Sequence, residues 1–331
     1  MIIVKTPLRL SFVGGGSDLK AFYERKEGMV ISSAIDKFVY VIVKRRFDDL
    51  ICINYSKRES VETVEDIEHD LVREAMKITG VKKGIEITTL ADIPSRGSGL
   101  GSSSSVTVGL LHALYVYKNE LVTAEQLATE ACKIEIDIIG KPIGKQDQYA
   151  AAYGGINQFI FHGDGSVERI PIELDHEAFM KFSSSLVLYY TGITRNADDI
   201  LARQKKNFSE DDKFQTMCKM ISLVEPFKDA LKRGDLEECG HLLDLNWQYK
   251  QRMAEGINNE RIEEMYEKAM SAGALGAKVA GAGGGGFMMF MVLKEKQDAV
   301  FSAMKDYRLL PFMLERGGSK VIFDNRGYSY K

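Results

Sequence analysis

The chain has 331 residues, of which 45% are hydrophobic and 27% charged, and its 44 basic and 47 acidic side chains give a formal net charge of −3. This balance offers no electrostatic footprint for nucleic acid or for an anionic membrane. The longest apolar run is FMMFMVL at 287–293, far short of the roughly 20 residues of a membrane span. The amino end has no signal-peptide layout, so we expect a cytoplasmic protein.

Patterns typical of zinc sites are missing from the sequence. Its four cysteines and five histidines are scattered, with no C-x-x-C pair and no H-x-x-x-H spacing, so a structural zinc site is not expected. A chain of this length exceeds the usual limit of a single core, which predicts two domains. Three glycine clusters stand out instead, at 14–16, 97–101 and 281–286.

The amino-terminal segment TPLRLSFVGGGSDL, residues 6–19, alternates apolar and polar residues before a glycine-rich bend. The alternation predicts a strand with its leucines on one face, so that Arg9 and Ser11 point to the other face, toward the bend and Asp18. An arginine at such a position can neutralise the charge that builds on a transferring phosphoryl group.

Further strands are expected at 41–44, 50–55 and 84–90, where β-branched residues cluster. The loop IPSRGSGLGSSSS, residues 93–105, then leads into an apolar segment that predicts a helix. Closely spaced glycines bring backbone N–H groups near a ligand, and a helix N-terminus carries unpaired N–H groups with partial positive charge. The pattern favours a phosphate cradle, naturally for a triphosphate, with a flexible loop and a serine N-cap as the alternative.

A capping box, Thr123-x-x-Gln126, starts another helix that we expect to run to about Ile139. Glu135 falls on the apolar face of this helix, and a carboxylate aimed at a core needs a cation. A Mg²⁺ ion that bridges phosphates and also contacts a serine hydroxyl would supply that cation. The alternative is a partly exposed residue at the edge of the apolar stripe.

The segment IGKQDQYAAAYGG, residues 143–155, places Asp147 among small residues in an irregular stretch. Polar residues on loops are common catalytic groups, although an Asp in a turn is often only a cap. A strand pair around a Gly-Asp-Gly turn closes the first half, and we place a domain boundary near residue 184, giving units 1–184 and 185–331 that both look α+β. Beyond it we expect strands at 185–192, 287–293 and 320–324 and helices at 211–233, 235–254, 259–272 and 296–307.

Two familiar nucleotide motifs are excluded. No G-K-[ST] follows any glycine cluster, so the P-loop pattern is absent. The spacing Gly281-x-Gly283-x-x-Gly286 matches G-x-G-x-x-G formally, but a strand-like run follows it where a dinucleotide fold would need a helix.

Three stretches together resemble the motifs of the GHMP kinase family, in the family's order: residues 6–19, PSRGSGLGSSSS at 94–105 and KVAGAGGGGF at 278–287. The resemblance covers essentially the whole chain. It implies a two-domain α+β fold, with an N-terminal domain like the second domain of ribosomal protein S5 and a ferredoxin-like C-terminal domain. ATP and the acceptor would bind in the cleft between the two domains.

The resemblance also implies roles for individual residues. Ser102 and Glu135 match the Mg²⁺ ligands of the family, and Asp147 matches the aspartate that orients or deprotonates the acceptor hydroxyl. Arg9 matches the basic partner of that aspartate, and Asp18 matches the aspartate that holds sugar hydroxyls. We expect ATP to contact Pro94, Gly97, Ser98, Gly99, Leu100, Gly101, Ser102, Ser103 and Ser104. We expect the substrate to contact Gly15, Gly16, Ser17, Asp18, Lys145, Arg195, Gly283 and Gly284.

The first motif departs from galactokinases, which have Gly-Glu-His-Thr-Asp where this chain has Gly-Gly-Gly-Ser-Asp at 14–18, so galactose is disfavoured. With KQDQYAAAYGGIN and YYTGITRNADDIL, this variant resembles the branch that contains D-glycero-D-manno-heptose 7-phosphate kinases. The implied reaction is transfer of the ATP γ-phosphoryl to the anomeric hydroxyl, which gives the 1,7-bisphosphate. Lys141, Lys145 and Arg195 are candidates for the far-end phosphate, although each could equally be a surface charge.

Other functions remain open at this stage. A fucokinase-like or other sugar 1-kinase would keep the chemistry with a different acceptor. A non-catalytic sugar or nucleotide sensor could keep the fold, although the joint presence of Arg9, Ser102, Glu135 and Asp147 argues against it. An ATP-dependent decarboxylase of the mevalonate route shares the fold as well. The expected partners are ATP, Mg²⁺ and a sugar phosphate, for a protein that is a monomer or a homodimer.

Overall fold

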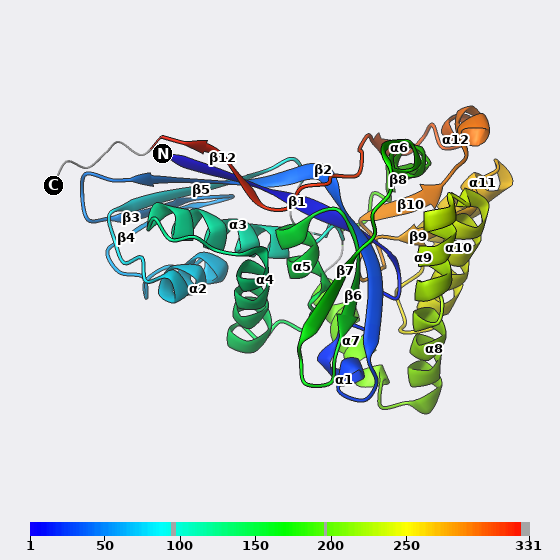
Figure 1. The fold of residues 1–331 in the computed structure, drawn as a ribbon, viewed down its shortest axis with the longest axis horizontal. Coiled ribbons are helices and arrows are strands. Elements are labelled where there is room, and N and C mark those ends of the chain that lie inside the picture. The colour runs from blue at the N-terminus through cyan, green and yellow to red at the C-terminus, as the bar shows by residue number, and fades with distance from the viewer. Residues whose placement is uncertain (94–96, 195–196, 326–331) are drawn as a thin grey trace.

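Two β-sheets organise the chain (Figure 1), of which this computed structural model describes residues 1–93, 97–194 and 197–325. The first sheet has eight strands in the order β12-β1-β2-β5-β3-β4, with β6 on β2 and β7 on β6. All its pairs are antiparallel except β3 with β5. Its strands are β1 Ile2–Val13, β2 Gly28–Arg45, β3 Ile51–Asn54, β4 Arg58–Val61, β5 Ile85–Ala91, β6 Ile156–Phe161, β7 Val167–Pro171 and β12 Lys320–Asp324.

The long strand β2 gives this sheet two wings. Its first part, 28–33, pairs with β6, whereas its second part, 39–45, pairs with β5. Strand β1 runs beside both parts, with register shifts after Pro7 and Ser11. The sheet therefore bends along β1 and β2 (Figure 1).

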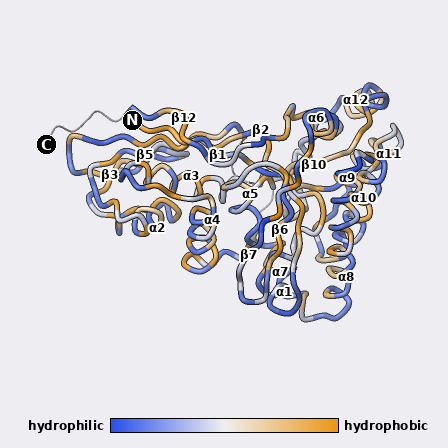
Figure 2. Tube along the Cα trace, viewed as in Figure 1, coloured by the Kyte–Doolittle hydropathy of each residue, from blue (hydrophilic) through white to orange (hydrophobic). Residues whose placement is uncertain are grey.

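Helices cover one face of the first sheet. They are α2 Asp70–Thr79, α3 Ser102–Tyr117, α4 Ala124–Cys132 and α5 Gln146–Tyr153, with a short α1 Lys20–Tyr23 after the first glycine cluster. Helix α3 packs on β1 and β2, and its apolar residues face a core on nearly every side. Hydrophobic and hydrophilic segments alternate along α2 (Figure 2), as expected for a helix with one packed face.

The second sheet has four antiparallel strands in the order β11-β8-β10-β9. Numbered within this half, the order is 4-1-3-2 with helices after the first and third strands, which is the ferredoxin-like arrangement. The strands are β8 Leu186–Tyr190, β9 Gly276–Val279, β10 Phe287–Met291 and β11 Arg308–Leu310. The helices of this half are α6 His176–Ser184, α7 Ala197–Asn207, α8 Asp211–Ile221, α9 Val224–Arg233, α10 Leu236–Gln251, α11 Glu260–Ser271 and α12 Gln297–Ala303, with a 3₁₀ turn, η2, at Lys294–Lys296.

Several elements differ from the sequence expectation. The helix expected over 211–233 is two helices, because Pro226 has no amide hydrogen to continue the first one. The helix expected to reach Ile139 changes to a π-helix, η1, over Lys133–Ile138. Strand β12 returns to the first sheet, where it pairs with β1. The end of the chain therefore belongs to the sheet that precedes the expected boundary near residue 184, and this boundary stays a prediction. Within the described residues, no helix is long and apolar enough to cross a membrane.

Candidate active site

An ion pair between Arg9 and Asp147 joins strand β1 to the first turn of α5. Arg9 Nε and Nη2 donate to the two carboxylate oxygens of Asp147 at 2.7 Å each, and Nη1 donates to the carbonyl oxygen of Gly99 at 2.7 Å. The side chains of Arg9 and Asp147 are 5% and 23% exposed. The bidentate geometry therefore fixes both groups while the carboxylate keeps some access to a bound molecule.

The glycine-rich loop before α3 ends against this ion pair. Gly97, Gly99 and Gly101 have φ of +72°, +73° and +77°, a region that favours glycine. Gly101 is the N-cap of α3, so the serine cap considered from the sequence does not form and the first-turn amides have no side-chain cap. A Cβ on Gly101 would lie 3.2 Å from both Arg9 Cγ and Asp147 Oδ2. The uncapped amides thus form an anion cradle directly beside Arg9 and Asp147.

The third glycine cluster, in the connection between β9 and β10, packs backbone to backbone against this loop. A Cβ on Gly99 would lie 2.5 Å from the carbonyl oxygen of Ala280, and a Cβ on Gly286 would lie 2.5 Å from that of Ser98. Real Cβ atoms do not approach that closely, so only glycine allows the contact. The cluster therefore supports the cradle from the side of the second sheet.

Some of the expected substrate residues face elsewhere. Gly283 and Gly284 lie against Ile257, whose carbonyl oxygen accepts a hydrogen bond from the Gly284 amide at 2.8 Å. The Ser17 hydroxyl bonds the carbonyl oxygen of Met29 at 2.9 Å and so holds the bend. These three residues shape the surroundings of the site, but none of them is among the described residues that line the cavity beside Arg9 and Asp147.

A cavity of about 60 Å³ lies beside the Arg9–Asp147 pair. Its wall comes from β1, the bend before α1, the segment 143–147, helices α7 and α10 and the connection between β9 and β10. Segments from both halves of the chain therefore enclose one small space, which charged, amide and apolar side chains line together, next to the anion cradle. An acceptor bound here would lie between the cradle and Asp147.

Asp18 forms one wall of this cavity. It accepts hydrogen bonds from the Gly16 amide at 3.0 Å and from the side chain and backbone amides of Gln146 at 3.1 and 3.2 Å. Burial raises the pKa of Asp18, and the charge of Asp147 raises it further. Asp18 therefore lines the cavity with its carboxylate, and its role in holding a sugar hydroxyl stays a prediction.

Two amide side chains in the wall were not foreseen from the sequence. Gln204, on α7, is fully buried, and within the described residues neither of its amide atoms has a hydrogen-bond partner. The side-chain oxygen of Gln146 is buried and lacks a described partner as well. Buried polar atoms normally have partners, so these atoms are candidates to bond a ligand.

Lys250, on α10, also lines the cavity and was missed. Its side chain is buried, and Nζ donates to the carbonyl oxygen of Gly281 at 2.5 Å. Burial lowers the pKa of Lys250 to about 8, the charge of Arg9 lowers it too, and Asp18 and Asp147 act in the opposite direction. Nothing in the local sequence of an amphipathic helix distinguishes this lysine from a surface lysine.

The candidate metal ligand Glu135 lies on η1 and is fully buried. Ser103 Oγ donates to it at 2.5 Å, Gln148 Nε2 at 2.8 Å and Lys141 Nζ at 3.2 Å. The expected partner Ser102 instead shares a hydrogen bond with Ser98 at 3.1 Å. The hydroxyl nearest the carboxylate is thus that of Ser103, because α3 begins at Ser102 and each further residue turns about 100°.

The residues around Glu135 fit a magnesium ion. Mg²⁺ prefers one or two carboxylates together with substrate phosphates, and here one buried carboxylate and one hydroxyl lie next to the anion cradle. The cation that contacts Glu135 in the structure is Lys141, whose side chain is 21% exposed. In the part of the chain that the structure describes, no cluster of three or more His, Cys, Asp or Glu side chains offers a metal site of another kind.

Two of the three cations predicted for a far-end phosphate, Lys141 and Lys145, do not line the cavity. Lys145 turns away from it, bonds the carbonyl oxygen of Gly165 and lies 5.0 Å from the ring centre of Tyr23. Lys141 is engaged by Glu135. Arg195, and the expected ATP contact Pro94, lie outside the described residues.

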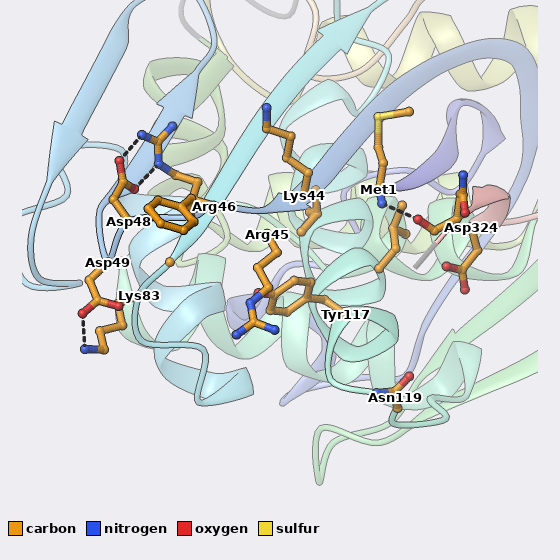
Figure 3. Close-up of a pocket in the computed structure, with 15 residues that line it drawn as sticks. Met1, Lys44, Arg45, Arg46, Asp48, Asp49, Lys83, Tyr117, Asn119 and Asp324 are labelled. Carbon is orange, nitrogen blue, oxygen red and sulfur yellow. Dashed lines mark hydrogen bonds and ion pairs between the residues drawn. The ribbon is translucent and has the colours of Figure 1, made fainter. Parts of the chain in front are cut away.

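A larger hollow of about 1050 Å³ lies at the far end of the first sheet (Figure 3). Its charged groups are mostly paired with one another: Arg46 with Asp48 at 2.6 Å and Lys83 with Asp49 at 2.8 Å. It has no glycine cradle and no buried unpaired polar side chain among the described residues. The chemistry of the molecule is therefore concentrated at the smaller cavity.

Comparisons with known proteins agree with this geometry. The family models described as GHMP kinases N terminal domain and GHMP kinases C terminal match residues 54–155 and 227–308. A D-glycero-alpha-D-manno-heptose 7-phosphate kinase from Campylobacter jejuni is 30% identical over 316 residues, which cover 92% of this chain and 93% of that protein. A galactokinase from Pyrococcus furiosus is 26% identical over 92% of both chains. The crystal structure of a D-glycero-D-manno-heptose 1-phosphate kinase from Bacteriodes thetaiotaomicron matches with a TM-score of 0.81 at 26% identity, covering 98% of this chain and 100% of that one.

Proposed function

The chain belongs to the GHMP kinase family as a sugar kinase that takes its phosphate from ATP, and we propose that its acceptor is D-glycero-D-manno-heptose 7-phosphate, phosphorylated at the anomeric hydroxyl. The names of two relatives that match over nearly their whole length, one a 7-phosphate kinase and one a 1-phosphate kinase, support a heptose phosphate. They differ in the phosphorylated position, so the position must be measured. The expected product is the 1,7-bisphosphate.

The unpaired amides of the cavity carry the argument for a sugar acceptor. Gln204 presents both an N–H donor and a carbonyl oxygen without described partners, and Gln146 presents a further oxygen. A hydroxyl group donates and accepts, so neighbouring sugar hydroxyls can satisfy all three atoms. A carboxylate only accepts and would leave the amide oxygens unpaired, which disfavours the acidic acceptor of a mevalonate-route decarboxylase.

The mechanism follows from the position of the ion pair. Asp147 accepts the proton of the anomeric hydroxyl, and Arg9, held by Asp147 and Gly99, neutralises charge on the phosphoryl group. The uncapped amides at the start of α3 hold the phosphates. Positioning and charge neutralisation are what phosphoryl transfer requires of a protein, and the site is built to supply both.

Magnesium is part of the proposal. Glu135 and Ser103 would hold the ion. Ser102, the preceding residue of α3, shares a hydrogen bond with Ser98 instead. When bound, Mg²⁺ would neutralise part of the charge of the ATP phosphates. Lys141, now paired with Glu135, would be released toward solvent or toward a phosphate.

The test is ADP release with Mg²⁺ and ATP across a panel of acceptors, followed by phosphorus NMR of the product. The panel contains D-glycero-D-manno-heptose 7-phosphate, the same heptose without phosphate, mannose 6-phosphate, fucose, galactose and mevalonate. Preference for the heptose 7-phosphate with a new anomeric phosphate supports the proposal. Preference for fucose would keep the chemistry but remove the far-end phosphate, and silence across the panel would favour a non-catalytic sensor.

A further inference from the structure

Lys250 is a buried cation whose head group borders the acceptor cavity. It is 4% exposed, and one of its three N–H donors is used, by the carbonyl oxygen of Gly281 at 2.5 Å. Among the described residues no second acceptor for its ammonium is found. An ammonium with spare donors at the edge of a cavity is a ready partner for an anionic group of a ligand.

A second buried lysine shows what a purely structural role looks like. Lys278, on β9, is 1% exposed, and its ammonium donates to the carbonyl oxygens of Ser11 and Phe12 at 2.7 and 2.9 Å. It does not line the cavity. Lys278 therefore ties the second sheet to β1, whereas Lys250 lines the cavity and has one described acceptor.

The anchor of Lys250 lies at the junction of the cavity and the phosphate cradle. A Cβ on Gly281 would lie 2.6 Å from the carbonyl oxygen of Gly99, so the two backbones are in direct contact. Arg9 bonds that same carbonyl oxygen of Gly99. The two cations thus approach the end of the cradle from different elements, β1 and α10.

We propose that Lys250 is a catalytic residue that binds the phosphoryl group in transfer, as a second cation beside Arg9. In the step, the anomeric oxygen forms its bond to the γ-phosphorus while the bond from that phosphorus to the β,γ-bridging oxygen breaks. ADP leaves with the electron pair of the broken bond, and the hydroxyl proton passes to Asp147. The inference rests on the acceptor cavity of the proposed function and does not depend on which sugar fills it.

The charges around Lys250 make its protonation sensitive to a bound anion. Arg9, Asp18 and Asp147 face it from β1, the first bend and α5, and Lys278 faces it from β9. In the free protein, burial and Arg9 hold the pKa of Lys250 near 8. A phosphate charge about 4 Å from the ammonium would raise the pKa of Lys250 by more than burial and Arg9 lower it, because water screens a buried ion pair only weakly. Phosphate binding near pH 8 should therefore be accompanied by proton uptake at Lys250.

Calorimetry tests this without turnover. A non-hydrolysable ATP analogue with Mg²⁺ is titrated into the protein at pH 8 in two buffers of different ionisation enthalpy, and the sugar phosphate is titrated alone in the same way. We expect proton uptake with the ATP analogue, its loss in Lys250→Gln, and a fall in kcat of roughly 10- to 1,000-fold for that variant with the best acceptor of the panel. Lys213→Gln is the matched control, because the half-buried Lys213 lies away from the cavity and also bonds a backbone carbonyl, that of Arg252 just after α10.

Lys250→Arg separates charge from folding. It keeps the positive charge but does not titrate near pH 8, so it should retain much of kcat and lose the proton uptake. Proton uptake with the sugar phosphate alone would assign Lys250 to the phosphate of the acceptor and overturn the proposal, as would unchanged kcat and uptake in a folded Lys250→Gln protein. Because the titration with the ATP analogue uses no acceptor, it stands even if the choice of heptose 7-phosphate fails.

Discussion

Replacing Asp147 by asparagine tests whether its carboxylate is the proton acceptor, because the substitution exchanges one carboxylate oxygen for an NH₂ group. Both carboxylate oxygens of Asp147 accept bonds from Arg9 at 2.7 Å, so in Asp147→Asn one amide N–H₂ faces a guanidinium donor and the proton acceptor is lost. Loss of a general base lowers kcat by about 10²- to 10⁴-fold, which corresponds to about 3 to 5 kcal/mol of transition-state stabilisation. Leaving a buried charge unpaired costs about 3 to 5 kcal/mol of stability, but the 23% exposure of Asp147 lets water enter, so we expect about 1 to 3 kcal/mol here.

The assay measures kcat and KM by ADP release, and urea unfolding measures stability. Asp298→Asn, which changes an exposed carboxylate in the first turn of α12, is the control and should change neither. Because Asp147 acts in the transition state, kcat should fall while KM for ATP stays within a few-fold of the wild-type value. A folded Asp147→Asn protein with near-normal kcat, or a defect confined to KM, would refute the role of Asp147 as proton acceptor.

Three further substitutions address separate parts of the site. Glu135→Gln should raise the free Mg²⁺ concentration needed for half-maximal activity by about tenfold or more. Asp137→Asn, on the exposed side of the same π-helix, is the control and should not change it. Equal dependence of activity on Mg²⁺ in the two variants would contradict the metal assignment. Gln204→Leu should raise the acceptor KM by about 10- to 100-fold through lost hydrogen bonds, with unchanged affinity for an ATP analogue by calorimetry, and an unchanged KM would show that its amide faces no acceptor. Gly101→Ala should lower kcat, because the new Cβ would press on the Arg9–Asp147 ion pair. Gly140→Ala is the control for backbone strain alone, because Gly140 has a similar φ of +78° but open space around it. Equal kcat in the two variants would show that the contact of the Cβ with the ion pair is harmless.

Local pattern was enough to predict the parts of the molecule that depend on neighbours in sequence. Strand alternation placed Arg9, a glycine-to-helix transition predicted the uncapped start of α3 as a phosphate cradle, and the two-domain α+β fold is confirmed. The sequence analysis named Ser102 as the Mg²⁺ ligand, whereas the hydroxyl that contacts Glu135 is that of Ser103, because a one-residue difference in the start of α3 rotates the serines past Glu135. Whether either serine binds Mg²⁺ stays a prediction.

Other features depend on contacts that periodicity does not encode. The amide of Gln204 reaches the cavity only because α7 packs over the first glycine bend, where a Cβ on Gly16 would lie 2.4 Å from Gln204 Nε2. Lys250 reaches it only because α10 packs against β9 and β1. The different directions of two neighbouring residues were not foreseen either, because Lys145 precedes α5 and bonds the carbonyl oxygen of Gly165 while Gln146 begins the helix and lines the cavity.

The buried cations near the cavity lower the stability of the fold and indicate which kind of ligand the site binds. Arg9, Asp18 and Asp147 lie around Lys250, and Lys278 lies near Arg9 and Lys250. Burial, with repulsion among the cations, lowers the pKa of Lys250 to about 8 and lowers that of Lys278 well below its usual range. A lysine with a depressed pKa in the folded state destabilises the fold at neutral pH, and this penalty disappears as pH rises from about 8 toward the unfolded value. An anion bound between the cations removes the same penalty at neutral pH, so phosphate binding and folding stability are coupled at this point. A buried lysine that lines a cavity and has one described acceptor therefore favours an anionic ligand at this point.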